Sequence, residues 1–396
     1  MTILSNIPLA KLSVAWVTMF LIGTELFVFS PLLPMLADDY QISATMAGLS
    51  VAIFSLTYMM SAPLLGHLAD RVGRRRVLIC SLLAVAAANL LTVLATNLPS
   101  LLAARLLAGT AAAGVSPSIY ALVGEAAPPD RRATWLALVV SGLLASLALG
   151  ASIGTIIGAS FGWSHVFLAL AFLALVLACL NRGTWPSERI AVSVARTAAA
   201  LPLAGTGVLR RLVPTVLWSM GLYGVYTYLG VGLAAVGYST EGIAQAILVY
   251  GCGALAGVVI GGRLADRLGA KSIAGASFIG LCTCLILLRV AFDTGRLIEP
   301  ALGVSSAVAQ LFFPAQQAGL ANDFPNRRGA ALAWNNSALF CGISLGSLVG
   351  GGALALGDFD TNLMISAGIA LVGCLVNAAL VPGSAPLAAV RAKHSE

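Results

Sequence analysis

Charged residues are scarce in this sequence: only 9% of its 396 residues are Asp, Glu, Lys or Arg, whereas 59% are apolar. Soluble domains carry roughly 25% charged residues, because a folded surface has to stay hydrated. A chain this poor in charge must face lipid over much of its surface. The composition therefore excludes a soluble enzyme and predicts a membrane protein.

Several motifs are also absent. The sequence has no G-x-x-x-x-G-K-[ST] phosphate loop, which argues against an ATP-driven pump. It has only three histidines (His67, His165 and His394), and no nucleophile–base arrangement stands out. The seven cysteines lie in apolar segments and are interpreted as small hydrophobic residues, without a metal or redox motif. We therefore expect no enzymatic activity, no metal and no cofactor.

Long apolar runs dominate the rest of the chain. One bilayer crossing needs about 20 mostly apolar residues, so these runs predict an all-helical membrane protein. The first run, 14–36, is too long for the core of a signal peptide and is interpreted as a retained span. A polar stretch predicts a linker at 182–211 between two six-span domains, 1–181 and 212–396. The twelve predicted spans are 14–36, 46–65, 77–96, 99–124, 133–157, 163–181, 212–235, 242–262, 272–291, 298–320, 330–355 and 362–381.

The placement of Lys and Arg predicts the orientation, because cytoplasmic loops carry an excess of both. A cytoplasmic N-terminus puts 19 of the 22 basic residues inside, leaves Arg289 and Arg296 outside, and places Arg105 within a span. The net charge of +7 thus reflects membrane topology rather than nucleic-acid binding. We expect a monomer in a bacterial inner membrane, with both termini in the cytoplasm.

The sequence contains an internal repeat. The run GHLADRVG at 66–73 recurs 196 residues later as GRLADRLG at 262–269. The same offset carries Gly150 and Gly154 onto Gly346 and Gly350, and it carries Pro129, Arg131 and Arg132 onto Pro325, Arg327 and Arg328. The chain is therefore interpreted as a duplicated six-span unit. Parallel repeats with a substrate site between them near the midplane are a known transporter plan.

The repeated run also carries a resemblance. Residues 66–75, GHLADRVGRR, match the signature of the loop between spans 2 and 3 in the major facilitator superfamily, and the resemblance covers essentially the whole chain. It implies two pseudo-symmetric six-helix bundles that rock about a central cavity. It also implies a conformational latch at the cytoplasmic ends of the spans, formed by Gly66, Asp70, Arg71, Gly73, Arg74, Arg75, Arg131 and Asp266.

Two further stretches resemble the drug:proton antiporter and sugar efflux branch of that family. Gly23–Phe27, followed by two prolines, is similar to its first span, and Arg105 with two glycines is similar to its fourth. The run Gly150-x-x-x-Gly154-Thr155-x-x-Gly158 resembles the antiporter signature, although Thr155 and Ala159 replace its usual proline and last glycine. The three glycines lie on one helix face, where small residues allow close packing.

Two charged residues lie deep within predicted spans, Glu25 in the first and Arg105 in the fourth. A charge at mid-membrane costs about 2.5–3.5 kcal/mol on insertion scales and marks a functional candidate. Burial disfavours the ionised carboxylate while a neighbouring arginine favours it, so Glu25 is expected to exchange a proton during transport. The alternative is a buried ion pair that only fixes helix packing.

Polar and aromatic residues within other spans are candidates for lining the substrate cavity, because binding pockets combine apolar walls with a few placed polar groups. Alternatively, their amides stitch helices together. The candidates are Tyr58, Tyr223, Tyr226, Tyr250, Gln310, Gln316, Gln317, Trp334, Asn335 and Asn336.

Together these features predict a secondary transporter that exports a small organic molecule against inward proton flow. The substrate stays open between a drug and a metabolite such as a sugar, nucleoside or siderophore. A proton symporter for uptake and a non-transporting membrane receptor of the same fold are the alternatives.

Overall fold

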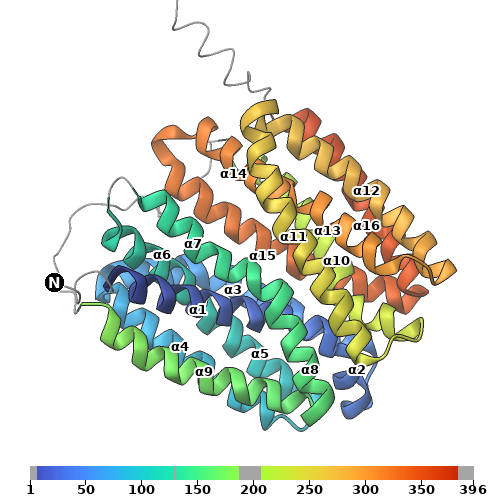
Figure 1. The fold of residues 1–396 in the computed structure, drawn as a ribbon, viewed down its shortest axis with the longest axis horizontal. Coiled ribbons are helices and arrows are strands. Elements are labelled where there is room, and N and C mark those ends of the chain that lie inside the picture. Colours follow the sequence, from blue (N-terminus) through green and yellow to red (C-terminus); the bar gives the residue numbers. More distant parts are fainter. Residues whose placement is uncertain (1–6, 129–130, 187–206, 382–396) are drawn as a thin grey trace, which may run out of the picture. The chain divides into compact units, whose positions relative to one another are not determined.

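The computed structural model describes residues 7–128, 131–186 and 207–381, and within these ranges all regular secondary structure is helical (Figure 1). The helices form two compact units. One comprises residues 1–196 with 239–244, and the other comprises 197–238 with 245–396. Residues 129 and 130, most of the predicted linker (187–206) and the C-terminal tail (382–396) lie outside the described residues.

The first unit contains the helices of the first six predicted spans, with a π-helical turn at Ser146–Gly150 between α7 and α8. Its helices are α1 (Ile7–Phe27), α2 (Phe29–Tyr40), α3 (Ala44–Val72), α4 (Arg74–Val93), α5 (Leu98–Ala112), α6 (Val115–Ala126), α7 (Arg132–Ala145), α8 (Ala151–Phe161) and α9 (Trp163–Thr184).

The second unit contains the helices of the last six spans, apart from the first turn of α11. They are α10 (Val208–Ala235), α11 (Thr240–Leu268), α12 (Ala270–Thr294), α13 (Ile298–Gln310), α14 (Phe312–Asp323), α15 (Arg328–Leu356) and α16 (Phe359–Leu380), with a 3-10 turn at Pro325–Arg327.

Each predicted span coincides with a helix or with two helices in succession. Eleven helical segments of the described chain are long and apolar enough to cross a membrane. The remaining predicted span, 298–320, is divided into α13 and α14 at Leu311. The predicted all-helical membrane fold is therefore confirmed.

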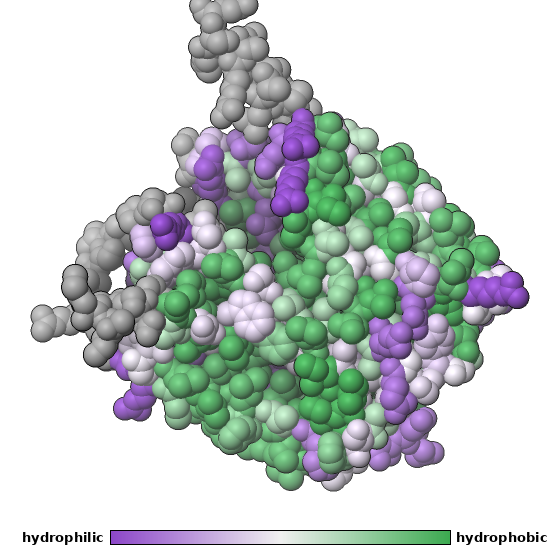
Figure 2. Space-filling view, in the orientation of Figure 1, coloured by the Kyte–Doolittle hydropathy of each residue, from purple (hydrophilic) through white to green (hydrophobic). Residues whose placement is uncertain are grey.

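Large apolar side chains cover the outside of the helices. Leu64 is 71% exposed, and Phe161 and Phe172 are each 69% exposed. Hydrophobic residues predominate on the face drawn in Figure 2. Exposed apolar surface on this scale would drive association in water, so it is suited to contact with lipid tails.

Glycines bring equivalent helices together in both units. A Cβ atom added to Gly150 would lie 2.1 Å from Thr24 Oγ1, and one added to Gly154 would lie 2.3 Å from Val28 Cγ2. In the second unit a Cβ on Gly346 would lie 2.5 Å from Met220 O, and Gly350 meets α10 in the same way. The repeat found in the sequence thus extends to helix packing.

Two details differ from the sequence-based prediction. The signature expected in a loop between spans 2 and 3 is largely helical, because α3 continues to Val72 and only Gly73, at φ 104°, interrupts it. Glycine tolerates this left-handed region at no steric cost. Arg211, which we assigned to the linker, instead lies in the first turn of α10 and is only 6% exposed.

Candidate functional site

Glu25 and Arg105 form a buried ion pair in the first unit. Arg105 Nη1 donates to Glu25 Oε1 at 2.5 Å, although 80 residues separate the two in the sequence. The side chain of Glu25 is 0% exposed and that of Arg105 is 1% exposed. Burying an ion in a low-dielectric medium costs several kcal/mol, so the two charges depend on each other.

The guanidinium of Arg105 is held by more than the carboxylate. Its Cζ atom lies 4.2 Å from the ring centroid of Phe29 and 4.5 Å from that of Phe54. A cation over an aromatic face is attracted by the ring quadrupole, most strongly where water is excluded. Arg105 Nη2 also donates to the backbone oxygen of Glu25 at 3.3 Å. Arg105 therefore keeps several contacts that do not involve the Glu25 carboxylate.

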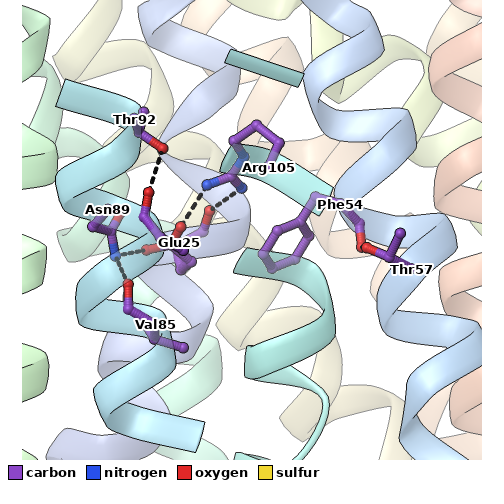
Figure 3. Close-up of polar contacts among 8 residues, drawn as sticks. Glu25, Phe54, Thr57, Val85, Asn89, Thr92 and Arg105 are labelled. Atoms are coloured by element: carbon purple, nitrogen blue, oxygen red, sulfur yellow. Dashed lines mark hydrogen bonds and ion pairs between the residues drawn. The ribbon is translucent and has the colours of Figure 1, made fainter. Parts of the chain in front are cut away.

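Asn89, on α4, completes the cluster and was missed by the sequence reasoning. Its Nδ2 donates to Glu25 Oε2 at 2.9 Å and to Val85 O at 3.1 Å, and its side chain is fully buried (Figure 3). The available signal was an amide within an apolar run, the same signal that identified other candidates. Glu25 thus receives one hydrogen bond on each carboxylate oxygen, from two different helices.

The π-helical turn lies against the residues that precede Glu25. A Cβ atom added to Gly23 would lie 1.9 Å from Ser146 Oγ, and Gly150 is in tight contact with Thr24. Turns of this kind occur frequently at functional sites. The predicted packing face, Gly150, Gly154 and Gly158, therefore sets how closely the helix carrying Glu25 approaches its neighbour.

Most of the candidate latch residues lie where α3 ends and α4 begins. Arg74 pairs with Asp70 at 3.2 Å and also with Glu125. Gly66 and Arg71 lie in the last turns of α3, Arg75 lies in the first turn of α4 and donates to the backbone oxygen of Arg182, Arg131 precedes α7, and Asp266 lies near the end of α11. The pairing of Asp70 with an arginine is observed, whereas its role as a latch stays a prediction.

Among the substrate candidates, three tyrosines of the second unit lie together. The rings of Tyr223 and Tyr226 are 6.3 Å apart, those of Tyr226 and Tyr250 are 5.2 Å apart, and all three are buried. Gln310 is hydrogen-bonded to Tyr223. Tyr58 is buried in the first unit, with its ring 6.4 Å from that of Phe54.

The other candidates contact the protein itself. Gln316 Nε2 donates to Arg211 O at 2.6 Å and to Thr215 Oγ1 at 3.1 Å, and Thr215 in turn donates to Asn335 Oδ1 at 2.6 Å. Trp334 packs against an apolar cluster, and Gln317 and Asn336 are half-buried. These bonds agree with the helix-stitching alternative for Gln316 and Asn335.

A second buried arginine lies beside these amides and was not among the candidates. Arg211 Nε donates to Asp323 Oδ2 at 2.6 Å, and the two side chains are 7% and 27% exposed. Arg211 lies in the first turn of α10 and Asp323 ends α14, so each charge lies near the favourable terminus of the other's helix. The pair ties these two helix ends together. Within the described residues, no group of three or more His, Cys, Asp or Glu side chains could hold a metal ion.

Duplicated apolar helices that bury an ion pair such as Glu25 and Arg105 are typical of an integral membrane protein of the transporter class. The sequence model of the protein family described as Major Facilitator Superfamily matches residues 15–298 and 215–396 of this chain. The chain belongs to the major facilitator superfamily.

Individual relatives agree with this assignment. The chain is 30% identical over 344 residues to an uncharacterized MFS-type transporter, YceJ, of Bacillus subtilis (strain 168), covering 84% of this chain and 86% of that protein. It is 28% identical over 275 residues to a chloramphenicol resistance protein of Streptomyces lividans, covering 68% and 69% of the two chains. A crystal structure of a D-xylose-proton symporter shares the fold, with a TM-score of 0.79, 19% identity, and coverage of 94% of this chain and 98% of that one.

Proposed function

We propose that this transporter exports a small organic molecule in exchange for protons, driven by the proton gradient and without a cofactor. The observation that carries the proposal is the fully buried Glu25, bonded to Arg105 and Asn89. Among the described residues, Glu25 is the one acidic residue that is buried, with an exposed fraction of 0%. An ionisable group at such a position in a membrane protein is a candidate proton carrier.

Protonation of Glu25 changes the charge of the cluster. While Glu25 is ionised, it neutralises Arg105, and the pair has no net charge. Once Glu25 binds a proton, the cluster carries the single positive charge of Arg105. A buried charge costs free energy that a buried neutral pair does not, so the two states differ in their preference for hydration. This difference couples proton binding to the change of access.

The direction of transport is the second part of the proposal. The similarity to a chloramphenicol resistance protein and the antiporter-like glycine run favour export. The fold shared with a D-xylose-proton symporter agrees equally with uptake by symport, which is the second candidate. The buried tyrosines and Gln310 of the second unit suit a solute with hydrogen-bonding groups, such as a sugar, nucleoside or siderophore.

Substitution of Glu25 by Gln tests the proton-carrier role, because the amide preserves shape but cannot release a proton. The variant is compared with the wild type and with Glu241→Gln, which changes an exposed glutamate at the start of α11. A host lacking its own exporters is first screened with chloramphenicol, sugars, nucleosides and siderophores. We expect Glu25→Gln to abolish proton-driven transport of the solute identified, with normal protein levels, and Glu241→Gln to retain it. Unchanged proton-driven flux in Glu25→Gln would contradict the proposal.

Vesicle orientation distinguishes export from uptake. In energised inverted vesicles an exporter accumulates the solute, and adding the solute releases protons from the acidified interior. A symporter for uptake accumulates the solute only in right-side-out vesicles. A receptor of the same fold binds the solute without accumulating it in either preparation.

We also propose that the Asp70–Arg74–Glu125 contacts act as a latch that holds one state of the cycle. The protein is proposed to act as a monomer in a bacterial inner membrane, with both termini cytoplasmic. The distribution of Lys and Arg supports this orientation.

A further inference from the structure

In the side-chain amide of Asn89, the nitrogen makes hydrogen bonds and the oxygen makes none among the described residues. Nδ2 donates to Glu25 Oε2 and to the carbonyl of Val85, one helical turn away. Oδ1 is buried and has no hydrogen-bond partner within the described part of the chain. A primary amide carries two donors on nitrogen and an acceptor on oxygen, and a half-turn about its terminal bond exchanges them.

We propose that Asn89 is a positioning residue that serves both protonation states of Glu25, an inference that rests on the proposed proton-carrier function. The amide nitrogen donates to the ionised carboxylate, as observed. When a proton from the aqueous phase binds Oε2, the amide turns over and Oδ1 accepts a hydrogen bond from the new O–H group of Glu25. Only the O–H bond forms, and the carboxyl charge changes from −1 to zero.

Arg105 is less suited to this task. A guanidinium has donors only, so it cannot accept a hydrogen bond from a carboxylic acid. Arg105 is also held by Phe29, Phe54 and the backbone oxygen of Glu25, contacts that do not depend on the carboxylate. Arg105 thus stays in place while the amide of Asn89 responds. When the amide turns, Asn89 loses its hydrogen bond to Val85 O. That backbone oxygen lies within the helical hydrogen-bond ladder of α4.

Within the described ranges, Arg105 is the one ionisable side chain bonded to the Glu25 carboxylate. The helices around the cluster carry further titratable groups, none with a hydrogen bond or ion pair to Glu25: Asp38, Asp39 and Tyr40 on α2; Tyr58, His67, Asp70 and Arg71 on α3; Arg74, Arg75, Arg76 and Cys80 on α4; Tyr120 and Glu125 on α6; Arg132 on α7; and His165, Cys179 and Arg182 on α9.

The test is an infrared pH titration of the purified full-length protein in lipid nanodiscs, which needs no transported solute. The C=O stretch of protonated Glu25 is identified as the band that disappears in Glu25→Gln. In Asn89→Leu the acid O–H loses its acceptor, so we expect that band to shift to higher wavenumber. Asn89→Gln, which keeps the amide, is expected to shift it less. A Glu25 band at the wild-type position in Asn89→Leu would overturn the proposal.

Two further variants separate this role from a general loss of stability. Asn362→Leu removes a buried amide of the second unit that donates to Gly224 O at 3.0 Å, and it is expected to leave the Glu25 band unchanged. If Asn89→Leu does not fold, Asn89→Met supplies an unbranched apolar side chain that adapts to irregular space. The flux assay of Glu25→Gln tests the proton-carrier role separately, so an unshifted band alongside lost flux would reject only the role of Asn89.

Discussion

Arg105 illustrates how single residues shape this site. Its planar guanidinium lies close to the rings of Phe29 and Phe54 and donates to both the side chain and the backbone of Glu25. A lysine has the same charge but lacks a flat group with several fixed donors. The geometry therefore requires arginine specifically, beyond the need for a positive charge.

Substitution of Arg105 by Lys tests this requirement. The ammonium group of lysine cannot reach both Oε1 and the backbone oxygen of Glu25 while it also contacts the rings of Phe29 and Phe54. We expect proton-driven flux to fall by about tenfold or more, equivalent to at least about 1.4 kcal/mol. Arg289→Lys, which changes an arginine whose side chain is 45% exposed, is the matched control and is expected to transport normally. Equal flux in the two variants would show that charge alone suffices at position 105.

Helices of the two repeats pack alike at their glycine faces but differ in one detail. The second half has a continuous helix, α15, across 342–346, the positions equivalent to the π-helical turn Ser146–Gly150. The irregular turn therefore belongs only to the repeat that holds Glu25, and it lies directly beside the preceding residues Gly23 and Thr24. An irregular helix at this position allows local adjustment next to the charged cluster, whereas α15 is a regular helix at the equivalent positions.

The glycine face of α15 leads to a prediction about stability. In Gly346→Ala the added Cβ would lie 2.5 Å from Met220 O and 2.9 Å from Gly224 N, both backbone atoms that cannot rotate away. We expect a loss of about 1–3 kcal/mol, as overpacking typically causes, seen as a lower thermal midpoint in detergent.

Gly352→Ala is the matched control on the same helix, because a Cβ there has no neighbour within 4 Å. Replacing an unconstrained helical glycine by alanine is favourable by up to about 1 kcal/mol. We therefore expect its thermal midpoint to be unchanged or higher. A similar midpoint drop in both variants would contradict the packing argument.

At the scale of the whole molecule, the duplicated halves have diverged at the charged cluster. The positions equivalent to Glu25, Asn89 and Arg105 in the second half are Gly221, Leu285 and Ala301. The second half therefore lacks a counterpart of this cluster and instead places buried tyrosines on α10 and α11. This asymmetry supports a division of tasks in which the first repeat carries the proton.

The orientation of the chain is testable with single cysteines in a variant whose seven native cysteines are replaced. Thr96 and Gly183 are both exposed at helix ends, on opposite sides of the membrane in the predicted topology. Because the Lys and Arg bias places the end near Gly183 in the cytoplasm, we expect an impermeant maleimide to label Thr96→Cys on intact cells. Gly183→Cys should be labelled only after lysis. The reverse pattern would show that the orientation is wrong.

The spans were predictable because each transmembrane helix satisfies its own backbone hydrogen bonds and needs a long apolar run. Glu25 and Arg105 were predictable because a charge within such a run is conspicuous. Asn89 was missed because a single amide within an apolar run does not show which neighbouring helix it faces. Arg211 was assigned to the linker because a helix that begins with two adjacent arginines resembles a polar loop.

The amino-acid sequence by itself determined the all-helical membrane fold, the duplication and the presence of one acid and one base within predicted spans. These properties follow from local composition and spacing. Only the tertiary structure decided that Arg105 and Asn89, 80 and 64 residues from Glu25, meet the same carboxylate, and that Arg211 meets Asp323. Such contacts depend on how helices distant in the chain rotate and pack, which hydropathy does not encode.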